Sequence, residues 1–416
     1  MLSTLLPAAS PAMLAASMRG ARLLRVARAA HALNPRNAGP YAGPSTITDN
    51  GAAIPTQTSA AFPFTAAAPG VWTTNGGRPF SAGGAFRFQS ATIFTSGGNG
   101  GLNDGKNVNF WRATANVHAR YLAVKLYPTA ASYRFIVDGR YVSPTGTVLA
   151  TTTGGTAQHV LLDFATRGLR QVTIEGQGTC GFGGAYVEPT GKVFPVDTSE
   201  DVRLAFLGDS YVYGSAASHL ADGLVPVMAD WLGMRALASG SGGTGWNQTN
   251  QATAWRFDQR IAQGDLSLDT VPPDVIALMA SVNDRLRDSA VVQANALTGL
   301  QTARALHPGV PILVFGCVPI PNGPLTGTPS LTSTEQAVQA AVTTFADPLC
   351  RFVPVTLDPA GAWSTGTGAI GAETGSGNAD WLFVADKTHL SDEGCAAMGR
   401  RYAAAALGAL GGMLGA

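Results

Sequence analysis

The first half of the chain alternates short apolar runs with turn-forming residues. Between residues 71 and 196 lie five runs rich in Val, Ile, Phe and Tyr: FRFQSATIF, YLAVKLYP, YRFIVDGRYVS, HVLLDFA and LRQVTIEG. Such runs predict β-strands, and Asp138-Gly139 between alternating apolar positions predicts a two-residue hairpin turn. No helical period of useful length interrupts them. We therefore expect an all-β sandwich or jelly roll, preceded by an irregular linker from residue 39 to about residue 70.

The pattern changes after residue 198. Apolar strands are expected at residues 203–208, 236–238, 274–280, 311–318 and 351–355, and helices at residues 217–232, 289–306, 333–346 and 392–409. Buried strands that alternate with helices predict a parallel sheet covered on both faces, which is a three-layer α/β domain. The expected organisation is a helical arm (1–38), a β domain with its linker (39–198) and an α/β domain (199–416).

Residues 1–38 predict an amphipathic helical arm. Its apolar part is followed by four arginines at three-residue spacing, which keeps them loosely on one side of a helix: Arg19, Arg22, Arg25 and Arg28. A secretory signal carries its positive charges before the apolar part, so this order argues against one. Two roles stay open for this helix: docking onto the rest of the chain, and binding a partner chain or assembly. A cleaved signal and a membrane-surface helix are the remaining alternatives.

Composition narrows the classes of partner. Charged residues make up 13% of the 416 residues and the net charge is +1, which gives no general attraction to nucleic acid or anionic lipid. No apolar run reaches the roughly 18 residues that a transmembrane helix needs. The four cysteines have no metal-ligand spacing, so neither a metal nor another cofactor is expected. Free thiols and a single bridge such as Cys317–Cys350 both stay open.

Four loops with unusual chemistry follow the apolar strands or precede the last helix. They are Gly208-Asp209-Ser210, ASGSGGTG (238–245), SVND (281–284) and DKTHLS (386–391). Parallel strands end at one edge of their sheet, so we expect these loops to meet there. Taken singly, each has a structural explanation: Ser210 as a helix N-cap, Asn283 and Asp386 as turn formers, and His389 as a helix-entry residue.

Taken together, in this order, the four loops resemble those of the SGNH (GDSL-type) hydrolase family, over residues 203–410. The resemblance implies a flavodoxin-like parallel sheet and a serine esterase. It implies Ser210 as nucleophile, His389 and Asp386 as the rest of a triad, and Gly242 and Asn283 as oxyanion donors beside the Ser210 N–H. One position departs from the family, because Ser281 stands where glycine is usual.

The chemistry fits these roles. A serine hydroxyl needs a base, and His389 serves if a carboxylate holds its other nitrogen; Asp386, three residues earlier, can do so from the same loop. A glycine at 242 lets the backbone approach the developing oxyanion closely. We expect Asp209 to shape the turn rather than join the triad. His219 is a second candidate base near Ser210 in sequence.

Two inserts, residues 319–333 and 359–381, are expected to frame the pocket. They are rich in Gly, Thr and Ser, and the second carries Trp363 and Trp381. They lack the broad apolar surface of a long-chain lipase lid. Tryptophans in polar loops suit stacking on sugar rings, although packing anchors explain them equally simply.

The order of domains resembles two-domain carbohydrate esterases, which remove acetyl groups from polysaccharides. We therefore expect hydrolysis of short-chain esters, such as acetyl groups on a polysaccharide, and an acylated glycan or small ester as substrate. The arm adds the hypothesis of a virion-attached or prophage tail enzyme, acting outside the cell. The alternatives are a glycan-binding or structural protein with secondary esterase activity, and a lysophospholipase, thioesterase or acyltransferase of the same fold.

Overall fold

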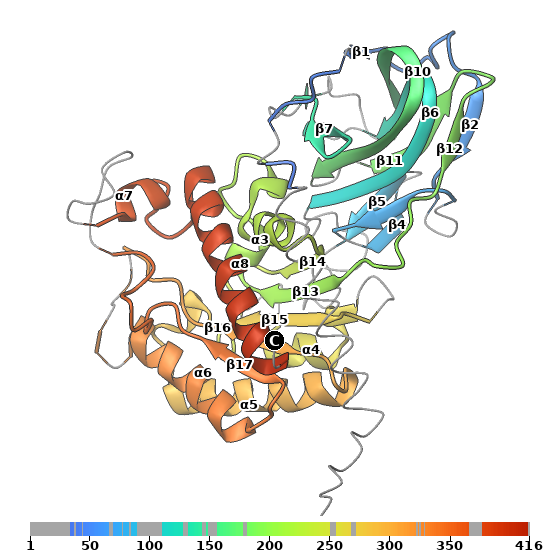
Figure 1. The fold of residues 1–416 in the computed structure, drawn as a ribbon. Coiled ribbons are helices and arrows are strands. Elements are labelled where there is room, and N and C mark those ends of the chain that lie inside the picture. The colour runs from blue at the N-terminus through green and yellow to red at the C-terminus, as the bar shows by residue number, and fades with distance from the viewer. Residues whose placement is uncertain are drawn as a thin grey trace, which may run out of the picture.

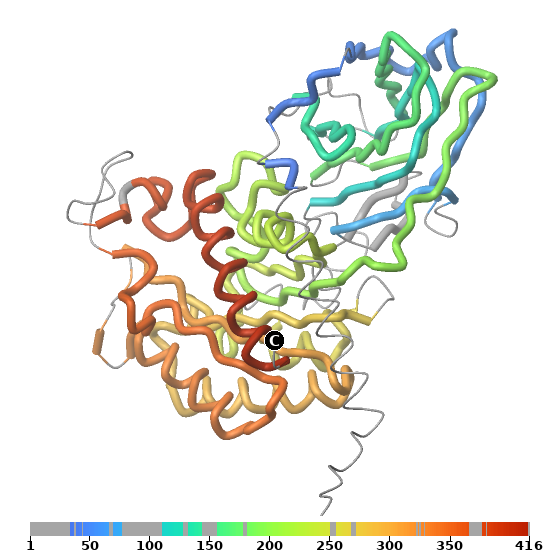
Figure 2. The backbone as a smooth tube through the Cα atoms, viewed as in Figure 1, coloured from blue at the N-terminus to red at the C-terminus, as the bar shows by residue number. Residues whose placement is uncertain are grey.

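The computed structural model describes seventeen stretches of the chain. They are residues 34–36, 39–43, 45–65, 70–76, 78–82, 85–89, 110–127, 132–143, 147–148, 156–177, 181–249, 255–267, 272–321, 323, 326–327, 329–365 and 377–414. Two sheets dominate this part of the chain. Figure 2 shows them as separate parts of the molecule. The change from one to the other falls between Phe194 and Arg203.

The first sheet is antiparallel and has ten described strands. Six follow the order β2-β11-β6-β10-β7-β8, and the other four pair with members of that row. Its strands are β1 (Thr46–Asp49), β2 (Ala60–Pro63), β3 (Thr73–Asn75), β6 (Phe110–Tyr127), β7 (Ser132–Val137), β8 (Arg140–Tyr141), β9 (Thr147–Val148), β10 (Gln158–Gln177), β11 (Gly181–Val187) and β12 (Lys192–Phe194). A separate hairpin pairs β4 (Arg78–Ala82) with β5 (Ala85–Gln89). An antiparallel β domain was expected and is present.

Two long, curved strands organise this domain, as Figure 1 shows. β6 has 18 residues and β10 has 20, and they pair along nearly their whole length. The sequence predicts two shorter strands where β10 is continuous, because a bulge between Asp163 and Gly168 breaks its apolar alternation. Ten of the twelve described strands of this domain form one hydrogen-bonded sheet, and a jelly-roll topology is not confirmed. Asp138 and Gly139 both have positive φ, as the predicted hairpin turn requires.

The second sheet is parallel, with five strands in the order β14-β13-β15-β16-β17. In chain order this is 2-1-3-4-5, the flavodoxin-like arrangement. The strands are β13 (Arg203–Gly208), β14 (Arg235–Gly240), β15 (Val275–Met279), β16 (Ile312–Phe315) and β17 (Cys350–Val353). All five match predicted strands, because each is nearly continuous in apolar residues.

Helices cover the parallel sheet in two layers (Figure 1). α3 packs against α8, whereas α5 packs against both α4 and α6. The helices are α2 (Ser210–Tyr213), α3 (Leu224–Leu232), α4 (Phe257–Ala262), α5 (Ser289–Leu306), α6 (Leu331–Phe345), α7 (Ala379–Leu382) and α8 (Asp392–Leu414), with short 3₁₀ turns η1 (Leu220–Asp222), η2 (Asp265–Ser267) and η3 (Val282–Asp284). The predicted helix at 217–232 is shorter than expected, because Gly223 separates η1 from α3.

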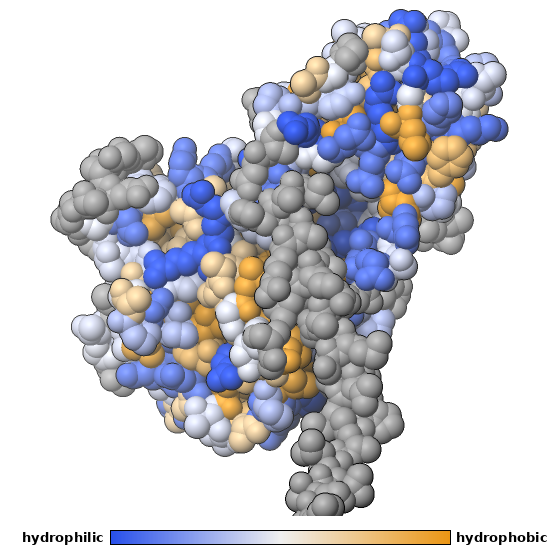
Figure 3. All heavy atoms as spheres, in the orientation of Figure 1, coloured by the Kyte–Doolittle hydropathy of each residue, from blue (hydrophilic) through white to orange (hydrophobic). Residues whose placement is uncertain are grey.

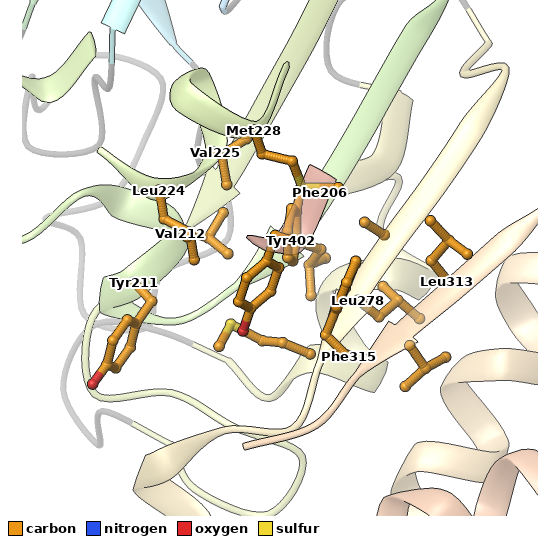
Figure 4. Close-up of a cluster of buried hydrophobic side chains, with 14 of the residues drawn as sticks. Phe206, Tyr211, Val212, Leu224, Val225, Met228, Leu278, Leu313, Phe315 and Tyr402 are labelled. Atoms are coloured by element: carbon orange, nitrogen blue, oxygen red, sulfur yellow. The ribbon is translucent and has the colours of Figure 1, made fainter. Parts of the chain in front are cut away.

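Aromatic side chains fill the space between the parallel sheet and α8. Figure 4 shows Tyr402 of α8 against Phe206 and Phe315 of the sheet. The Phe315 and Tyr402 ring centroids are 4.5 Å apart, and the Phe206 and Phe315 centroids are 5.7 Å apart. Tyr211, which follows Ser210, lies at the edge of the same core and is 3% exposed. The strand that leads to Ser210 is therefore anchored in the hydrophobic core of the domain.

A group of buried and partly buried charges joins the antiparallel sheet to η1 and α3 of the α/β domain. We call it the interface cluster; its members are Arg36, Arg112, Arg134, Glu175, Asp222 and Asp230. Arg112 of β6 donates to Glu175 at 2.7 Å and to Asp230 of α3 at 2.9 Å. Arg134 of β7 donates to Glu175 at 2.6 Å and to Asp222 at 2.8 Å. Three positive and three negative groups balance, which is how charges are accommodated in a protein interior.

Arg36 extends this cluster to the segment before the β domain. Its guanidinium donates to Asp222 at 2.6 Å and to Asp230 at 2.8 Å. Burial alone would raise the pKa of Glu175, but Arg112 and Arg134 outweigh it and hold that pKa well below its usual range. The segment around Arg36 is therefore fixed to the α/β domain by charge.

The structure also bears on the predictions for the N-terminal arm, the cysteines and membrane-spanning segments. The predicted helical arm falls outside the described residues except for Asn34, Pro35 and Arg36, which form a turn. Cys317, Cys350 and Cys395 are buried free thiols. No helix in the described residues is long and apolar enough to cross a membrane. Polar and apolar side chains are interspersed over the face of the molecule seen in Figure 3.

Candidate functional site

Ser210 stands at the carboxyl end of β13, as the first residue of α2. Asp209 before it is the N-cap, and its Oδ1 accepts the Tyr211 N–H at 3.0 Å. Ser210 is therefore not the cap, and its hydroxyl is available for other contacts. A Cβ on Gly208 would lie 2.4 Å from Val212 Cγ2, so this sharp turn requires a glycine. The apolar strand and the glycine together bring Ser210 to the sheet edge.

The loop before α8 holds Asp386 and His389 in one tight turn. Asp386 Oδ1 accepts the backbone N–H of Thr388 at 2.8 Å and of His389 at 2.9 Å. Lys387 between them has φ +56°, the left-handed conformation that closes the turn. Tyr211 donates its hydroxyl hydrogen to the Thr388 carbonyl. The loop is thus attached directly to the helix that carries Ser210.

Ser210, His389 and Asp386 form a continuous chain of hydrogen bonds. His389 Nε2 lies 2.9 Å from Ser210 Oγ, and His389 Nδ1 lies 2.6 Å from Asp386 Oδ2. Burial acts to raise the pKa of Asp386, but hydrogen bonds from the His389 N–H and ring and from the Thr388 N–H outweigh it, and the pKa lies below its usual value. An ionised Asp386 fixes the hydrogen of His389 on Nδ1, which leaves Nε2 to accept the Ser210 hydroxyl hydrogen.

The glycine-rich loop after β14 lies against Ser210. A Cβ on Gly242 would stand 3.8 Å from Ser210 Cβ, and one on Gly240 would stand 2.0 Å from the Tyr213 nitrogen. Glycine therefore lets this loop approach α2 closely.

Asp284 holds the chain just after the glycine-rich loop. It accepts the N–H groups of Trp246, Asn247 and Gln248 at 2.7 to 3.0 Å. Burial raises the pKa of Asp284 to about 6 despite these bonds.

Asn283 joins the third loop to the second. It lies on η3, and its side-chain Nδ2 donates to the Thr244 carbonyl at 3.0 Å. The structure thus bonds Asn283 to the glycine-rich loop, whose Gly242 lies against Ser210. That Ser210, Gly242 and Asn283 surround one oxygen stays a prediction. Asp209 is fully buried and bonded to Tyr211 and Ser281, in agreement with the predicted scaffolding role.

His219, the second candidate base, lies elsewhere. Its Nδ1 accepts the Ala221 N–H at 3.2 Å, and the ring is 4% exposed beside the interface cluster. Burial, together with the charge of Arg134, lowers the pKa of His219 to about 4. A ring held neutral beside the interface cluster does not serve Ser210, whose hydroxyl is bonded to His389.

The sugar-stacking prediction for Trp363 is wrong. Trp363 is 3% exposed, its ring meets Tyr402 edge-on at 5.0 Å, and the Arg401 guanidinium lies 4.6 Å from its centroid. Its Nε1 donates to Asp358 at 2.6 Å. It is a packing anchor because the core, rather than the solvent, covers its ring. Trp381 of α7 is partly exposed at the edge of this core, just before the Asp386 loop.

Two buried charged residues support the site without having been predicted. Arg260 of α4 is fully buried and donates to the Gly208 carbonyl at 2.9 Å, to the Ser239 carbonyl at 2.7 Å and to Asp265 at 2.9 Å. It therefore ties the ends of β13 and β14 together beneath Ser210. No local pattern predicts this role, because the carbonyl groups of Gly208 and Ser239 are distant from Arg260 in sequence.

Glu335 of α6 ties together the ends of β16 and β17. It accepts four backbone N–H groups, those of Cys317 (2.9 Å), Val355 (2.9 Å), Thr356 (2.8 Å) and Leu357 (3.1 Å). Burial raises its pKa in spite of these bonds. One carboxylate thus fixes the points at which the chain leaves β16 and β17. In the described part of the chain, no group of three His, Cys, Asp or Glu residues could hold a metal ion.

Known structures share this fold over most of the chain. A salicylyl-acyltransferase from a tetracycline biosynthetic pathway is 16% identical, with a TM-score of 0.60 over 85% of this chain and 96% of that one. A family two carbohydrate esterase from Clostridium thermocellum is 15% identical, with a TM-score of 0.53 over 80% and 97%. One from Corynascus thermopiles, with a carbohydrate binding domain, is 13% identical, with a TM-score of 0.54 over 79% and 99%. At these identities the likeness concerns the fold alone.

The sequence comparisons assign the part of the chain that carries the site. No curated protein matches the chain. Residues 206–397 match the model of the GDSL-like Lipase/Acylhydrolase family. That match spans β13, the helices and strands that follow it, and every loop of the candidate site. Over residues 206–397 this protein is therefore similar to the GDSL-like Lipase/Acylhydrolase family.

Proposed function

We propose that the protein is a serine esterase that hydrolyses short-chain acyl esters, acting through Ser210, His389 and Asp386. The observation that carries the proposal is the hydrogen-bond chain from Ser210 Oγ through His389, 2.9 Å on one side, to Asp386, 2.6 Å on the other. Both distances lie within the range of a nucleophile, its base and the group that orients the base.

The steps follow from that chain. Ser210 Oγ attacks the ester carbonyl while His389 Nε2 takes its proton, and the carbonyl electron pair moves onto oxygen. The Ser210 and Gly242 N–H groups and the Asn283 amide stabilise this oxyanion. His389 then gives the proton to the leaving alcohol as the C–O bond breaks, which leaves an acyl-serine. Water, deprotonated by His389, attacks the acyl-serine. The bond between the acyl carbon and Ser210 Oγ then breaks, His389 returns the proton to Oγ, and the acid is released.

We propose an O-acetylated polysaccharide as the substrate class. Two observations support it: carbohydrate esterases share the fold across both sheets, and the inserts around the site are rich in Gly, Thr and Ser. Trp381, just before the Asp386 loop, is the proposed aromatic contact for a sugar ring. Trp363 is not, because its ring is buried in the core. The domain boundaries at residues 38 and 198 remain part of this proposal.

The test compares the wild type with Ser210→Ala on p-nitrophenyl acetate and on a panel of acetylated polysaccharides, with acetate release as the readout. Release by the wild type and its loss in the variant are expected. Hydrolysis of the small ester without release from any polysaccharide would remove the glycan and keep the esterase. The ratio of acetate to octanoate ester hydrolysis separates an acetylesterase from a lysophospholipase or thioesterase.

Acyl transfer is a second candidate, since the acyltransferase named above shares the fold over 85% of the chain. The same acyl-serine would then pass its acyl group to an alcohol instead of water. Turnover of p-nitrophenyl acetate with and without added sugar or alcohol acceptors distinguishes the two. An acylated acceptor that accumulates faster than free acetate would establish transfer.

Residues 1–38 are proposed to attach the enzyme to a partner chain or assembly, such as a virion. Arg36 belongs to the interface cluster, so a clean test removes residues 1–33 and keeps Arg36. Loss of self-association or assembly with unchanged hydrolysis of p-nitrophenyl acetate is expected. A fall in both would make those residues part of the fold, and a binding protein with secondary esterase activity would retain assembly in Ser210→Ala.

A further inference from the structure

Ser281 occupies the centre of a buried hydrogen-bond network beneath the site. It is fully buried, and four polar atoms surround its hydroxyl oxygen. These are Asp209 Oδ2 at 2.6 Å, the Thr244 carbonyl at 2.8 Å, the Asn283 backbone nitrogen at 3.1 Å and Asn283 Nδ2 at 3.2 Å. One side chain therefore touches the residue before Ser210, the glycine-rich loop and Asn283.

Counting hydrogens shows how Ser281 constrains Asn283. A hydroxyl donates one hydrogen and accepts two. Asp209 Oδ2, at the shorter distance, takes the Ser281 hydrogen, and the two lone pairs accept the Asn283 N–H and one Asn283 amide hydrogen. The Thr244 carbonyl can only accept, so it fixes Nδ2 rather than Oδ1 on that side and takes the other amide hydrogen.

Both hydrogens of the Asn283 amide are therefore directed before substrate arrives. The Thr244 bond holds the amide plane, and the Ser281 bond, at 3.2 Å, is the longer of the two. A hydroxyl lone pair is a weaker acceptor than an oxyanion, because hydrogen bonds to ionised acceptors are about twice as strong. The hydrogen aimed at Ser281, in the longer of the two bonds, is therefore the one for which an oxyanion competes best.

We propose that Ser281 is a positioning residue that acts through Asn283, holding its amide ready for the oxyanion. This inference rests on the proposed esterase function. A supporting shell that fixes a donor in advance is what makes electrostatic stabilisation effective. A merely structural role, as the N-cap of η3, would instead lower stability and leave turnover per folded molecule unchanged.

Ser281→Ala and Ser281→Thr test the proposal on p-nitrophenyl acetate. Alanine removes the hydroxyl without adding volume, and we expect kcat to fall about 10-fold with KM unchanged. Threonine keeps the hydroxyl and should retain more of kcat than alanine. The matched control is Ser333→Ala, which removes another buried serine hydroxyl, bonded to the Ser330 carbonyl at 3.1 Å on α6. It should lower the melting temperature and leave kcat unchanged.

The decisive measurement is the coupling to Asn283. If Ser281 acts through Asn283, Ser281→Ala has less than about a two-fold effect on kcat in an Asn283→Ala background. The full 10-fold loss in that background would overturn the proposal, as would an unchanged kcat in the single variant.

Crystal structures of the wild type and Ser281→Ala give a readout that does not need turnover. A displaced or rotated Asn283 amide is expected in the variant. An amide in the same place in both structures overturns the positioning role. A wild type with the expected Asn283 geometry but no activity on any ester would instead reject the proposed function and leave the network intact.

Discussion

The protein contains two buried polar clusters that are built in opposite ways. The interface cluster consists of full charges. At its centre Glu175, which has no exposed surface, lies between Arg112 and Arg134. The cluster around Ser210 instead joins single carboxylates, those of Asp209 and Asp386, to neutral groups such as the Ser281 hydroxyl and backbone N–H groups. Ion pairs hold separate elements of the fold together, whereas hydrogen bonds that involve a neutral group orient single atoms. The first should therefore control stability and the second activity.

Ser210→Ala is the largest expected perturbation and acts on activity alone. Loss of the proposed nucleophile should lower kcat roughly 10⁴- to 10⁶-fold, the effect seen when serine hydrolases lose theirs. Because the Ser210 hydroxyl meets only His389 among the side chains of the described residues, the melting temperature should stay the same. Steady-state kinetics and thermal unfolding check the two halves. A lower melting temperature in the variant would show that the cluster around Ser210 also contributes to stability.

Glu175→Gln should have the largest effect on stability. It keeps the shape of the side chain but leaves Arg112 and Arg134 without their shared carboxylate. Removing one partner of a buried ion pair costs about 3–5 kcal/mol. Urea unfolding measures the loss, and kcat on p-nitrophenyl acetate at a temperature where the variant is folded should be unchanged. A large fall in kcat would mean that the interface also orients the site.

His219 should make stability depend on pH at the interface. The folded protein holds it neutral with a pKa of about 4, whereas the unfolded chain takes up the proton near pH 6.5. The unfolded state then binds more protons between these values, so stability falls as the pH drops from 6.5 to 4, by on the order of 3 kcal/mol. His219→Gln should remove that part of the fall, as measured by unfolding at pH 7 and pH 4.5. An identical pH dependence in both proteins would contradict the assignment.

Arg36→Gln should have the smallest effect. Asp222 and Asp230 each keep another arginine, Arg134 and Arg112, so the loss is confined to hydrogen bonds to charged groups, about 2 kcal/mol. Thermal unfolding measures it. Susceptibility of the N-terminal segment to limited proteolysis should increase at the same time. No change in either would show that Arg36 contributes nothing to the interface.

The sequence predicts those parts of the molecule that have a local signature. Continuous apolar runs predicted the parallel strands, and the loops at their ends predicted Ser210, Asn283, Asp386 and His389, which the structure brings to one sheet edge. α2 and α7, with four residues each, were missed because a helix so short has no amphipathic period.

The missed parts of the site depend on tertiary contacts. Arg260 reaches the Gly208 carbonyl across 52 positions, and Glu335 reaches Thr356 across 21. A buried charge that pairs with distant backbone groups leaves no periodic trace in the sequence. Trp363 fails for a related reason, because an insert rich in Gly and Thr gives no sign that its tryptophan turns into the core.

The carboxylate of Glu335 bears on how this protein can diversify. It binds the chain at the start of both inserts, so the segments beyond residues 318 and 357 begin from fixed points whatever their length. Mutation and recombination can therefore exchange these segments without disturbing the sheet beneath them. A single helix residue thus marks the border between the sheet and the two segments that are open to change.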